Sequence, residues 1–401
     1  MAYLDHAATT PVRPEALAAL TSAYEQTGNA SSLHGAGRHA RKLVEEARES
    51  VAASLGCRPG EVVFTSGGTE SDNLAIKGIF WSRQADDAGR TRVLCSAVEH
   101  HAVLDPVLWL GEHEKAHVDL IGVDSVGRVE LAALAELIER DPASIALISV
   151  MAANNEVGTI EPVAKIVDLA REAAIPVHSD AVQAVGSIPI DFALLGLDAL
   201  TVSSHKVGGP HGVGALVARR GRTLEPVLHG GSQERSRSGT LDAPGIAGFA
   251  AALAAAVECR EDSAVRIGAL RDNLVRGVLL AVPDAVLTGD RDPAGRLPGH
   301  AHFSFPGCEG DALLMLLDAQ SVECSTGSAC TAGIPEPSHV LLAMGVDPEL
   351  ARGSLRFSLG WTSTQSDVDE LLDALPAVVD RARRAGRPRI RPMSRSLGGS
   401  E

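Results

Sequence analysis

The chain has 401 residues, is 45% hydrophobic and carries a formal net charge of −15, so it can bury a sizeable core and is poorly suited to binding nucleic-acid backbones. No apolar run reaches the ~18 residues of a membrane span. The start MAYLDHAATT lacks the pattern of a secretory signal, so we expect a cytoplasmic protein without membrane contact. The six cysteines show no CxxC spacing and predict free thiols, not a metal site.

Apolar runs that end in turn residues alternate with amphipathic stretches along the first 220 residues. The spacing predicts helices over 14–26, 40–56, 129–141 and 163–174, and strands over 61–66, 91–96, 145–151, 175–180, 197–203 and 213–218. Such alternation is typical of a mostly parallel sheet flanked by helices. One long alanine-rich helix is expected over 245–282, followed by a second segment with further strands.

A glycine turn, SGGTES, follows the strand expected over 61–66. Backbone N–H groups near Gly68 and the hydroxyl of Thr69 could bind one phosphate where a helix begins. An ordinary capped turn between strand and helix explains the same residues equally well. The chain contains neither GxGxxG nor GxxxxGK[ST], which argues against a Rossmann dinucleotide site and a P-loop.

Two charged residues stand at the ends of later strands. Asp180 ends the strand over 175–180, where a buried carboxylate needs a cation or several donors; alternatively it caps the next helix. Lys206 follows the strand over 197–203, and a desolvated lysine is a neutral amine that forms an imine with an aldehyde. An imine-forming lysine, an acid for a ring nitrogen and donors for a phosphate together meet the needs of pyridoxal 5'-phosphate.

Ten motifs in order along the chain resemble those of a known family. They are YLDHAATTPV (3–12), NASSLHGAGR (29–38), FTSGGTESDN (64–73), EHHAVL (99–104), NNEVGT (154–159), HSDAVQAVG (178–186), SSHKVGGPHGVGAL (203–216), QERSRSGT (233–240), STGSACTAG (325–333) and RFSLG (356–360). The chain resembles the cysteine desulfurases of the NifS and IscS type, group I of the class-V aminotransferase family. This resemblance implies an α/β transferase of fold type I that depends on pyridoxal 5'-phosphate, with a mostly parallel seven-stranded sheet in a large domain and a smaller α+β domain.

The resemblance implies catalytic roles for three residues. Lys206 is similar to the lysine that binds the cofactor and then removes the substrate's α proton. His100 resembles the histidine that stacks on the cofactor ring and assists proton transfer. Cys330 resembles the nucleophile that takes the substrate's sulfur as a persulfide, and its surroundings of Ser, Thr, Gly and Pro predict an exposed loop. The one metal role expected is that of Cys330 as a ligand to a cluster on a partner scaffold.

Further residues are implied to bind the cofactor or the substrate. The resemblance places the phosphate on Gly68, Thr69, Ser203 and His205, the ring nitrogen on Asp180, the phenolic oxygen near Gln183 and Asn155, and the substrate carboxylate on Asn155 and Arg356. Thr240 resembles a phosphate ligand that the neighbouring subunit supplies, so a homodimer is expected.

The expected reaction converts L-cysteine to L-alanine and leaves sulfur on Cys330 for an acceptor protein, such as an iron-sulfur scaffold or a thiolation enzyme for tRNA or cofactors. Another class-V enzyme, such as a selenocysteine lyase, would keep the same cofactor residues; the motif STGSAC favours the desulfurase, because transamination needs no thiol. We expect a large cofactor-binding domain over 15–260, a small domain from 1–14 and 261–380, and a flexible basic tail over 381–401.

Overall fold

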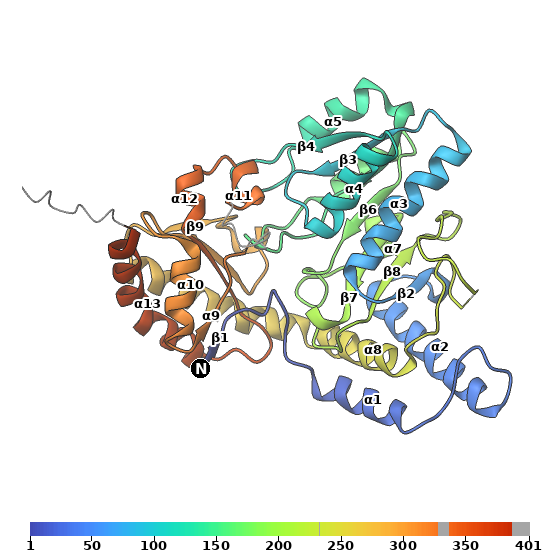
Figure 1. The fold of residues 1–401 in the computed structure, drawn as a ribbon, viewed down its shortest axis with the longest axis horizontal. Coiled ribbons are helices and arrows are strands. Elements are labelled where there is room, and N and C mark those ends of the chain that lie inside the picture. Colours follow the sequence, from blue (N-terminus) through green and yellow to red (C-terminus); the bar gives the residue numbers. More distant parts are fainter. Residues whose placement is uncertain (232, 328–336, 387–401) are drawn as a thin grey trace, which may run out of the picture.

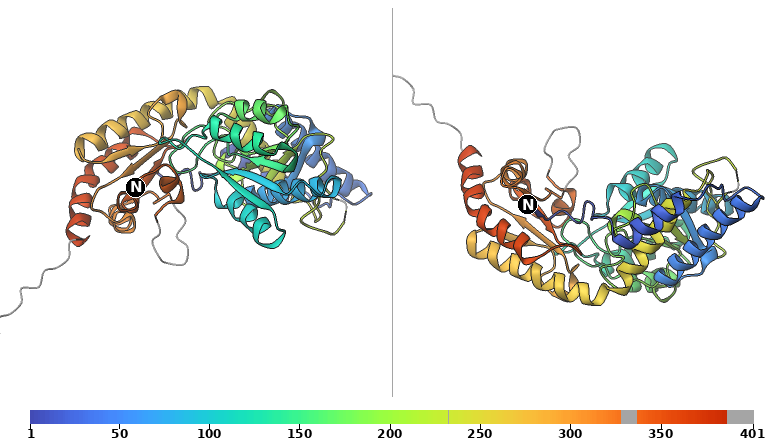
Figure 2. Two further views of the ribbon diagram at one scale, coloured as in Figure 1. Left: turned by 90° about the horizontal axis from the view of Figure 1, so that it is seen from above. Right: turned by 90° about the horizontal axis from the view of Figure 1, so that it is seen from below.

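The computed structural model describes residues 1–231, 233–327 and 337–386. It has two lobes of unequal size, which Figures 1 and 2 show side by side along the long axis of the molecule. The larger lobe contains a seven-stranded sheet, and the smaller lobe contains a three-stranded sheet. The expected α/β fold of type I is confirmed.

The seven-stranded sheet supplies most of the scaffold. In spatial order its strands are β2 (Val62–Thr65), β8 (Gly214–Ala218), β7 (Ala199–Ser203), β6 (Val177–Asp180), β5 (Ile145–Ser149), β3 (Arg92–Ser96) and β4 (His117–Ile121). Only β8 runs antiparallel to its neighbours; the other neighbouring strands are parallel. The carboxyl ends of β3, β5, β6 and β7 therefore meet at one edge, where open α/β sheets bind their ligands.

Helices cover both faces of this sheet. They are α1 (Pro14–Tyr24), α2 (Gly35–Leu55), α3 (Gly68–Asp86), α4 (His101–His113), α5 (Leu131–Arg140), α6 (Val163–Arg171), α7 (Phe192–Leu195) and α8 (Ala243–Glu258). Successive residues of a strand point to opposite faces: Val63 packs in one hydrophobic cluster with α3 and α4, whereas Phe64 packs in another with α2, α6 and α8. The strands are consequently apolar on both sides, as expected of a buried parallel sheet.

The smaller lobe combines the C-terminal third of the chain with its first residues. Its elements are β1 (Ala2–Tyr3), α9 (Arg260–Ala281), β9 (Val286–Thr288), β10 (His300–Ser304), α10 (Gly310–Asp318), β11 (Val322–Glu323), α11 (His339–Ala343), α12 (Pro348–Arg352), β12 (Ser354–Ser358) and α13 (Gln365–Gly386). Strand β10 pairs antiparallel with β9 and β12, and β1 pairs parallel with β11. Ala2 and Leu4 pack in the same cluster as Phe303 and Phe357, so the chain starts in the smaller lobe before it crosses to α1 (Figure 1).

The long helix expected over 245–282 is two helices in the structure. At Cys259 the backbone leaves the helical conformation (φ −90°, ψ 7°), and the axes of α8 and α9 differ by 71°. The prediction was wrong because the sequence at the bend contains neither proline nor glycine. In the described part of the chain no helix is by itself long and apolar enough to cross a membrane; α8 and α9 pass that test only as a bent pair.

Candidate active site

Lys206 ends a short 3-10 turn, Ser204–Lys206, directly after β7. Its Nζ donates to the backbone oxygens of Ala7 and Ala8, at 2.5 and 2.9 Å, so the N-terminal segment crosses against the amine. Burial, together with the positive charge of Arg356, lowers the pKa of Lys206 to about 8, against the opposite effects of Asp180 and Asp5. An amine with this pKa is partly neutral near pH 7 and can attack an aldehyde.

Asp180, the last residue of β6, is buried on the wall of the same site. The N–H of Val182 donates to its Oδ1 at 2.8 Å. Burial nevertheless raises the pKa of Asp180 to about 6, against the effects of that hydrogen bond and of the positive charge on Lys206. A carboxylate in this state is stabilised when a cation binds next to it.

A second group of residues forms a place for an anion where α3 begins. The first N–H groups of a helix lack partners within the helix, and α3 begins at Gly68 beside the buried Ser203. A Cβ on Gly68 would come within 3.0 Å of Val182 Cγ2, so glycine leaves the space for a ligand open. His205 contributes a ring whose Nδ1 lies 3.3 Å from Thr9 Oγ1, and burial lowers its pKa to about 4.

His100 and Gln183 border the same space from two loops. His100 is the residue before α4, and its Nδ1 accepts from the N–H of Ala102 at 3.0 Å. Burial lowers the pKa of His100 to about 4, and the neighbouring Lys206 contributes in the same direction, so the imidazole is neutral at pH 7. Gln183 donates from Nε2 to the Ala7 oxygen at 2.7 Å.

Arg356 comes from β12 of the smaller lobe. Its guanidinium pairs with Asp5 Oδ1 at 2.7 Å and donates to the main-chain oxygen of Asn155 at 3.0 Å. The side chain is 6% exposed, and its Nε has no hydrogen-bond partner among the described residues. A guanidinium fixed in this way is suited to a carboxylate, which it can bind through two parallel bonds.

One cavity of about 380 Å³ unites these residues at the boundary of the two lobes. Of the residues predicted from the sequence, its lining includes Gly68, Thr69, His100, Asn155, Asp180, Gln183, Ser203, His205, Lys206 and Arg356. Thr240 is exposed and lies outside this lining, in the segment between β8 and α8. Cys330 lies outside the described residues.

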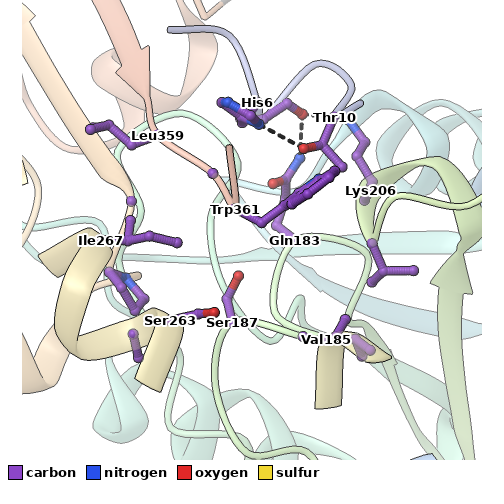
Figure 3. A pocket seen from close by; sticks show the side chains of 18 of the residues that line it. His6, Thr10, Gln183, Val185, Ser187, Lys206, Ser263, Ile267, Leu359 and Trp361 are labelled. Carbon is purple, nitrogen blue, oxygen red and sulfur yellow. Dashed lines mark hydrogen bonds between the residues drawn. The ribbon is translucent and has the colours of Figure 1, made fainter. Parts of the chain in front are cut away.

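A smaller cavity of about 80 Å³ shares Lys206 and Gln183 with the first (Figure 3). Figure 3 shows His6 and Thr10 from the N-terminal segment above it, with Trp361 beside them; His6 Nδ1 lies 2.6 Å from Thr10 Oγ1. Lys206 is thus accessible from two spaces.

The sequence did not single out several residues of the site. Asp5 lies 351 positions from Arg356, and nothing in the sequence indicates that the two pair. The sequence also does not indicate that the backbone oxygens of Ala7 and Ala8 accept hydrogen bonds from Lys206, although both residues belong to the motif YLDHAATTPV. Asp72, in the motif FTSGGTESDN, also lines the cavity.

These residues fit pyridoxal 5'-phosphate. The cavity offers a lysine amine with a lowered pKa, a buried carboxyl group that needs a cation, and a helix N-terminus next to small residues for a phosphate. The fold and the cavity together define a pyridoxal-phosphate-dependent enzyme of fold type I.

The comparisons with known proteins identify the family. The chain matches the family described as aminotransferase class-V over residues 2–371. It is 57% identical over 386 residues to an IscS-like cysteine desulfurase of Mycobacterium tuberculosis, with 96% of this chain and 98% of that protein covered. It is 43% identical to cysteine desulfurase IscS of Dictyoglomus turgidum, with 95% of each chain covered. A solved structure titled NifS-like protein is 36% identical, with a TM-score of 0.87, 95% of this chain and 100% of that chain covered. The chain therefore belongs to the class-V aminotransferase family, on the branch of the cysteine desulfurases.

Proposed function

We propose that the chain is a cysteine desulfurase that converts L-cysteine to L-alanine and holds the sulfur as a persulfide on Cys330. The observation that carries this proposal is that Lys206, Asp180 and Arg356 line one cavity. These three side chains are what an amino-acid substrate needs at a pyridoxal-phosphate site: an amine, a partner for the ring nitrogen and a clamp for the carboxylate. The names of the relatives supply the substrate, cysteine.

Each residue has a task in the proposed reaction. When bound, the cofactor withdraws electrons from the substrate's α carbon. Arg356, held by Asp5, binds the substrate carboxylate, and the amine of Lys206 removes the α proton. His100 is neutral at pH 7, and because its Nδ1 accepts the N–H of Ala102, its Nε2 carries the ring proton and can donate it within the site.

The sulfur transfer is balanced without a further reactant. The thiolate of Cys330 attacks the substrate sulfur, a sulfur–sulfur bond forms, and the carbon–sulfur bond breaks with its electron pair remaining on the β carbon. A proton then replaces sulfur at that carbon, which gives L-alanine. The products are L-alanine and a persulfide on Cys330 that an acceptor protein can receive, either an iron-sulfur scaffold or an enzyme of tRNA or cofactor thiolation.

The test of this function combines amino-acid analysis with mass spectrometry. The purified protein with cofactor and L-cysteine, but without reductant, should release L-alanine and gain one sulfur on Cys330. Cys330→Ser should keep the visible absorbance of the bound cofactor and lose the added sulfur, while Cys259→Ser should behave as the parent. Alanine release at the parent rate by Cys330→Ser would overturn the assignment of the nucleophile.

The proposal includes a homodimer with shared sites. Thr240 is exposed and outside its own chain's cavity, so it is available to bind the phosphate in a partner subunit. Mixing Thr240→Ala and Lys206→Ala proteins tests this: hybrid dimers should regain activity, because one of their two sites is intact. If the mixture stays as inactive as its components although hybrids form, Thr240 does not act across the interface.

The proposed domain division follows the hydrophobic clusters. The cluster around Phe303 contains residues 2–4 and 267–382, whereas the buried residues of the clusters on the two faces of the large sheet lie within 16–256, with Leu297 as the exception. This supports a large domain over 15–260 and a small domain from 1–14 and 261–380. We place the enzyme in the cytoplasm, where a thiol nucleophile stays reduced.

A further inference from the structure

Asp72 is a buried acid of the cavity to which the proposed reaction gives no task. It is the fifth residue of α3, it lines the cavity together with Asp180, and it is 1% exposed. Neither of its carboxyl oxygens has a hydrogen-bond partner of ordinary geometry among the described residues, although the Thr201 hydroxyl lies near enough to affect its pKa. A polar group this deeply buried without a partner calls for an explanation.

The basic group nearest to Asp72 does not supply a positive charge. His178 Nε2 lies 3.5 Å from Asp72 Oδ1. The ring is fully buried on β6, its Nδ1 lies 2.9 Å from Ser149 Oγ, and its Nε2 lies 3.0 Å from Thr201 Oγ1. Burial lowers the pKa of His178 to about 3, so the ring is neutral at pH 7.

The two charged groups that act most on Asp72, Asp180 and Glu99, are both acids. Strands β2, β5, β7 and β8, which pack against α3, contain no titratable side chain. The titratable groups on the remaining neighbouring elements and on α3 itself are Asp180 and His178 on β6; Glu99, His100, His101, Asp105, Glu112 and His113 before or on α4; Lys206 after β7; and Glu70, Lys77, Arg83 and Asp86 on α3. Glu70 pairs with Arg237, and Lys77 lies over Trp109.

Burial and the nearby Asp180 raise the pKa of Asp72 well above its ordinary value, while the Thr201 hydroxyl acts in the opposite direction. Two carboxyl groups at one buried wall cannot both ionise readily, because each negative charge disfavours the other. The ring nitrogen of the cofactor brings one positive charge, which can compensate one carboxylate. The second carboxyl group is then most stable with a proton.

We propose that Asp72 is a positioning residue that stays protonated in the holoenzyme, so that the negative charge beside the ring nitrogen remains on Asp180, a role that rests on the cofactor site proposed above. A protonated Asp72 lines the cavity without adding a second negative charge. Asparagine has nearly the same shape and is also neutral, so it should replace Asp72 in this role, whereas it cannot replace Asp180.

Infrared spectroscopy of the holoenzyme tests the proton directly. The spectrum of the parent minus that of Asp72→Asn at pH 8 should contain the carbonyl band of an un-ionised carboxylic acid, shifted in heavy water. Asp86→Asn is the matched control: this exposed acid on the same helix should remove a carboxylate band instead. If Asp72→Asn also removes a carboxylate band, Asp72 is ionised and the proposal is wrong. Asp72→Ser serves the same comparison if the asparagine variant does not fold.

Cofactor binding tests the positioning role. Asp72→Asn should keep the dissociation constant for pyridoxal 5'-phosphate within about threefold of the parent, whereas Asp180→Asn should weaken it roughly 100-fold or more. Asp72→Asn that weakens binding as much as Asp180→Asn would show that the charge on Asp72 is needed, which contradicts the proposal. Absence of a lysine-bound cofactor absorbance in the parent protein would instead contradict the proposed function.

Discussion

Asp180 and Arg356 are two buried ionisable side chains that line one cavity, and they differ in the partners that the rest of the chain gives them. Arg356, from the smaller lobe, is paired with Asp5 at 2.7 Å and bonded to the backbone of Asn155. Asp180, from the larger lobe, receives one backbone N–H and forms no salt bridge among the described residues. The guanidinium has a charged partner within the chain, whereas the carboxylate has none among the described residues and keeps a raised pKa.

The proposed function accounts for this difference by how long each ligand stays. A substrate leaves after every turnover, so the proposed carboxylate clamp has to be stable and correctly oriented between turnovers, and the contact with Asp5 holds Arg356 in this way. A resident cofactor can itself be the missing partner of Asp180. The cost of burying an unpaired carboxylate is then recovered as cofactor affinity.

The largest effect on activity is expected when Lys206 is replaced. The charges of Arg356 and Asp180 both act on the pKa of this residue. Lys206→Ala should lower the rate of alanine release by roughly 10³-fold or more, because the variant loses both its link to the cofactor and its base. Alanine release and the visible spectrum of the bound cofactor measure this. The exposed Lys42→Ala is the matched control and should keep the parent rate. A loss of less than tenfold in Lys206→Ala would show that another base serves the reaction.

Asp180→Asn removes the carboxylate that we propose as the partner of the cofactor's ring nitrogen. Removing one partner of a buried pair costs about 3–5 kcal/mol, so cofactor affinity should fall roughly 150- to 5,000-fold. A fluorescence titration with pyridoxal 5'-phosphate measures it, with the exposed Asp168→Asn as control. Unchanged affinity in Asp180→Asn would mean that the raised pKa of Asp180 has no connection with the cofactor.

Arg356→Lys keeps a positive charge but loses the planar fork that binds a carboxylate through two bonds. One charge-assisted hydrogen bond is worth about 1.5–2 kcal/mol, so KM for cysteine should rise roughly 10- to 30-fold, with a smaller change in cofactor affinity. Steady-state kinetics measure it, and the exposed Arg352→Lys should leave KM unaltered. If Arg356→Lys lowers the cofactor affinity as much as Asp180→Asn does, the assignment of Arg356 to the substrate and Asp180 to the cofactor is wrong.

The sequence predicted the side of the site that belongs to the parallel sheet. Asp180 and Lys206 follow adjacent strands, β6 and β7, and the carboxyl ends of parallel strands lie together in any such fold. The strand pattern alone therefore places both residues at one edge of the sheet. The motif resemblance then assigned the chemistry.

The remainder depends on tertiary contacts that leave no local pattern. Strand β4 has mixed exposure and was not predicted, because its sequence HVDLI does not alternate cleanly. The bend at Cys259 is not encoded by a helix-breaking residue. Asp72 reads as an ordinary residue of a helix's first turns; its burial beside Asp180 depends on how α3 packs on the sheet.

The smallest predicted effect concerns the protonation of Lys206, because Arg356 and Asp180 shift its pKa in opposite directions. With a pKa of about 8, the neutral fraction of this amine rises about fivefold between pH 7 and pH 8. The rate at which apoprotein captures pyridoxal 5'-phosphate should rise by the same factor and level off above pH 9, as stopped-flow absorbance would record. Lys206→Ala should show no such phase.

Substitutions of Arg356 and of Asp180 should shift the pH midpoint of cofactor capture in opposite directions. Arg356 lowers the pKa of Lys206 and Asp180 raises it. Arg356→Gln should therefore shift the midpoint to higher pH, because a repelling charge is lost, and Asp180→Asn should shift it to lower pH, because an attracting charge is lost. Burial acts in every variant, so both midpoints should stay below the ordinary lysine value. Shifts in the same direction would show that altered hydration of the cavity, and not the pair of opposed charges, sets the pKa of Lys206.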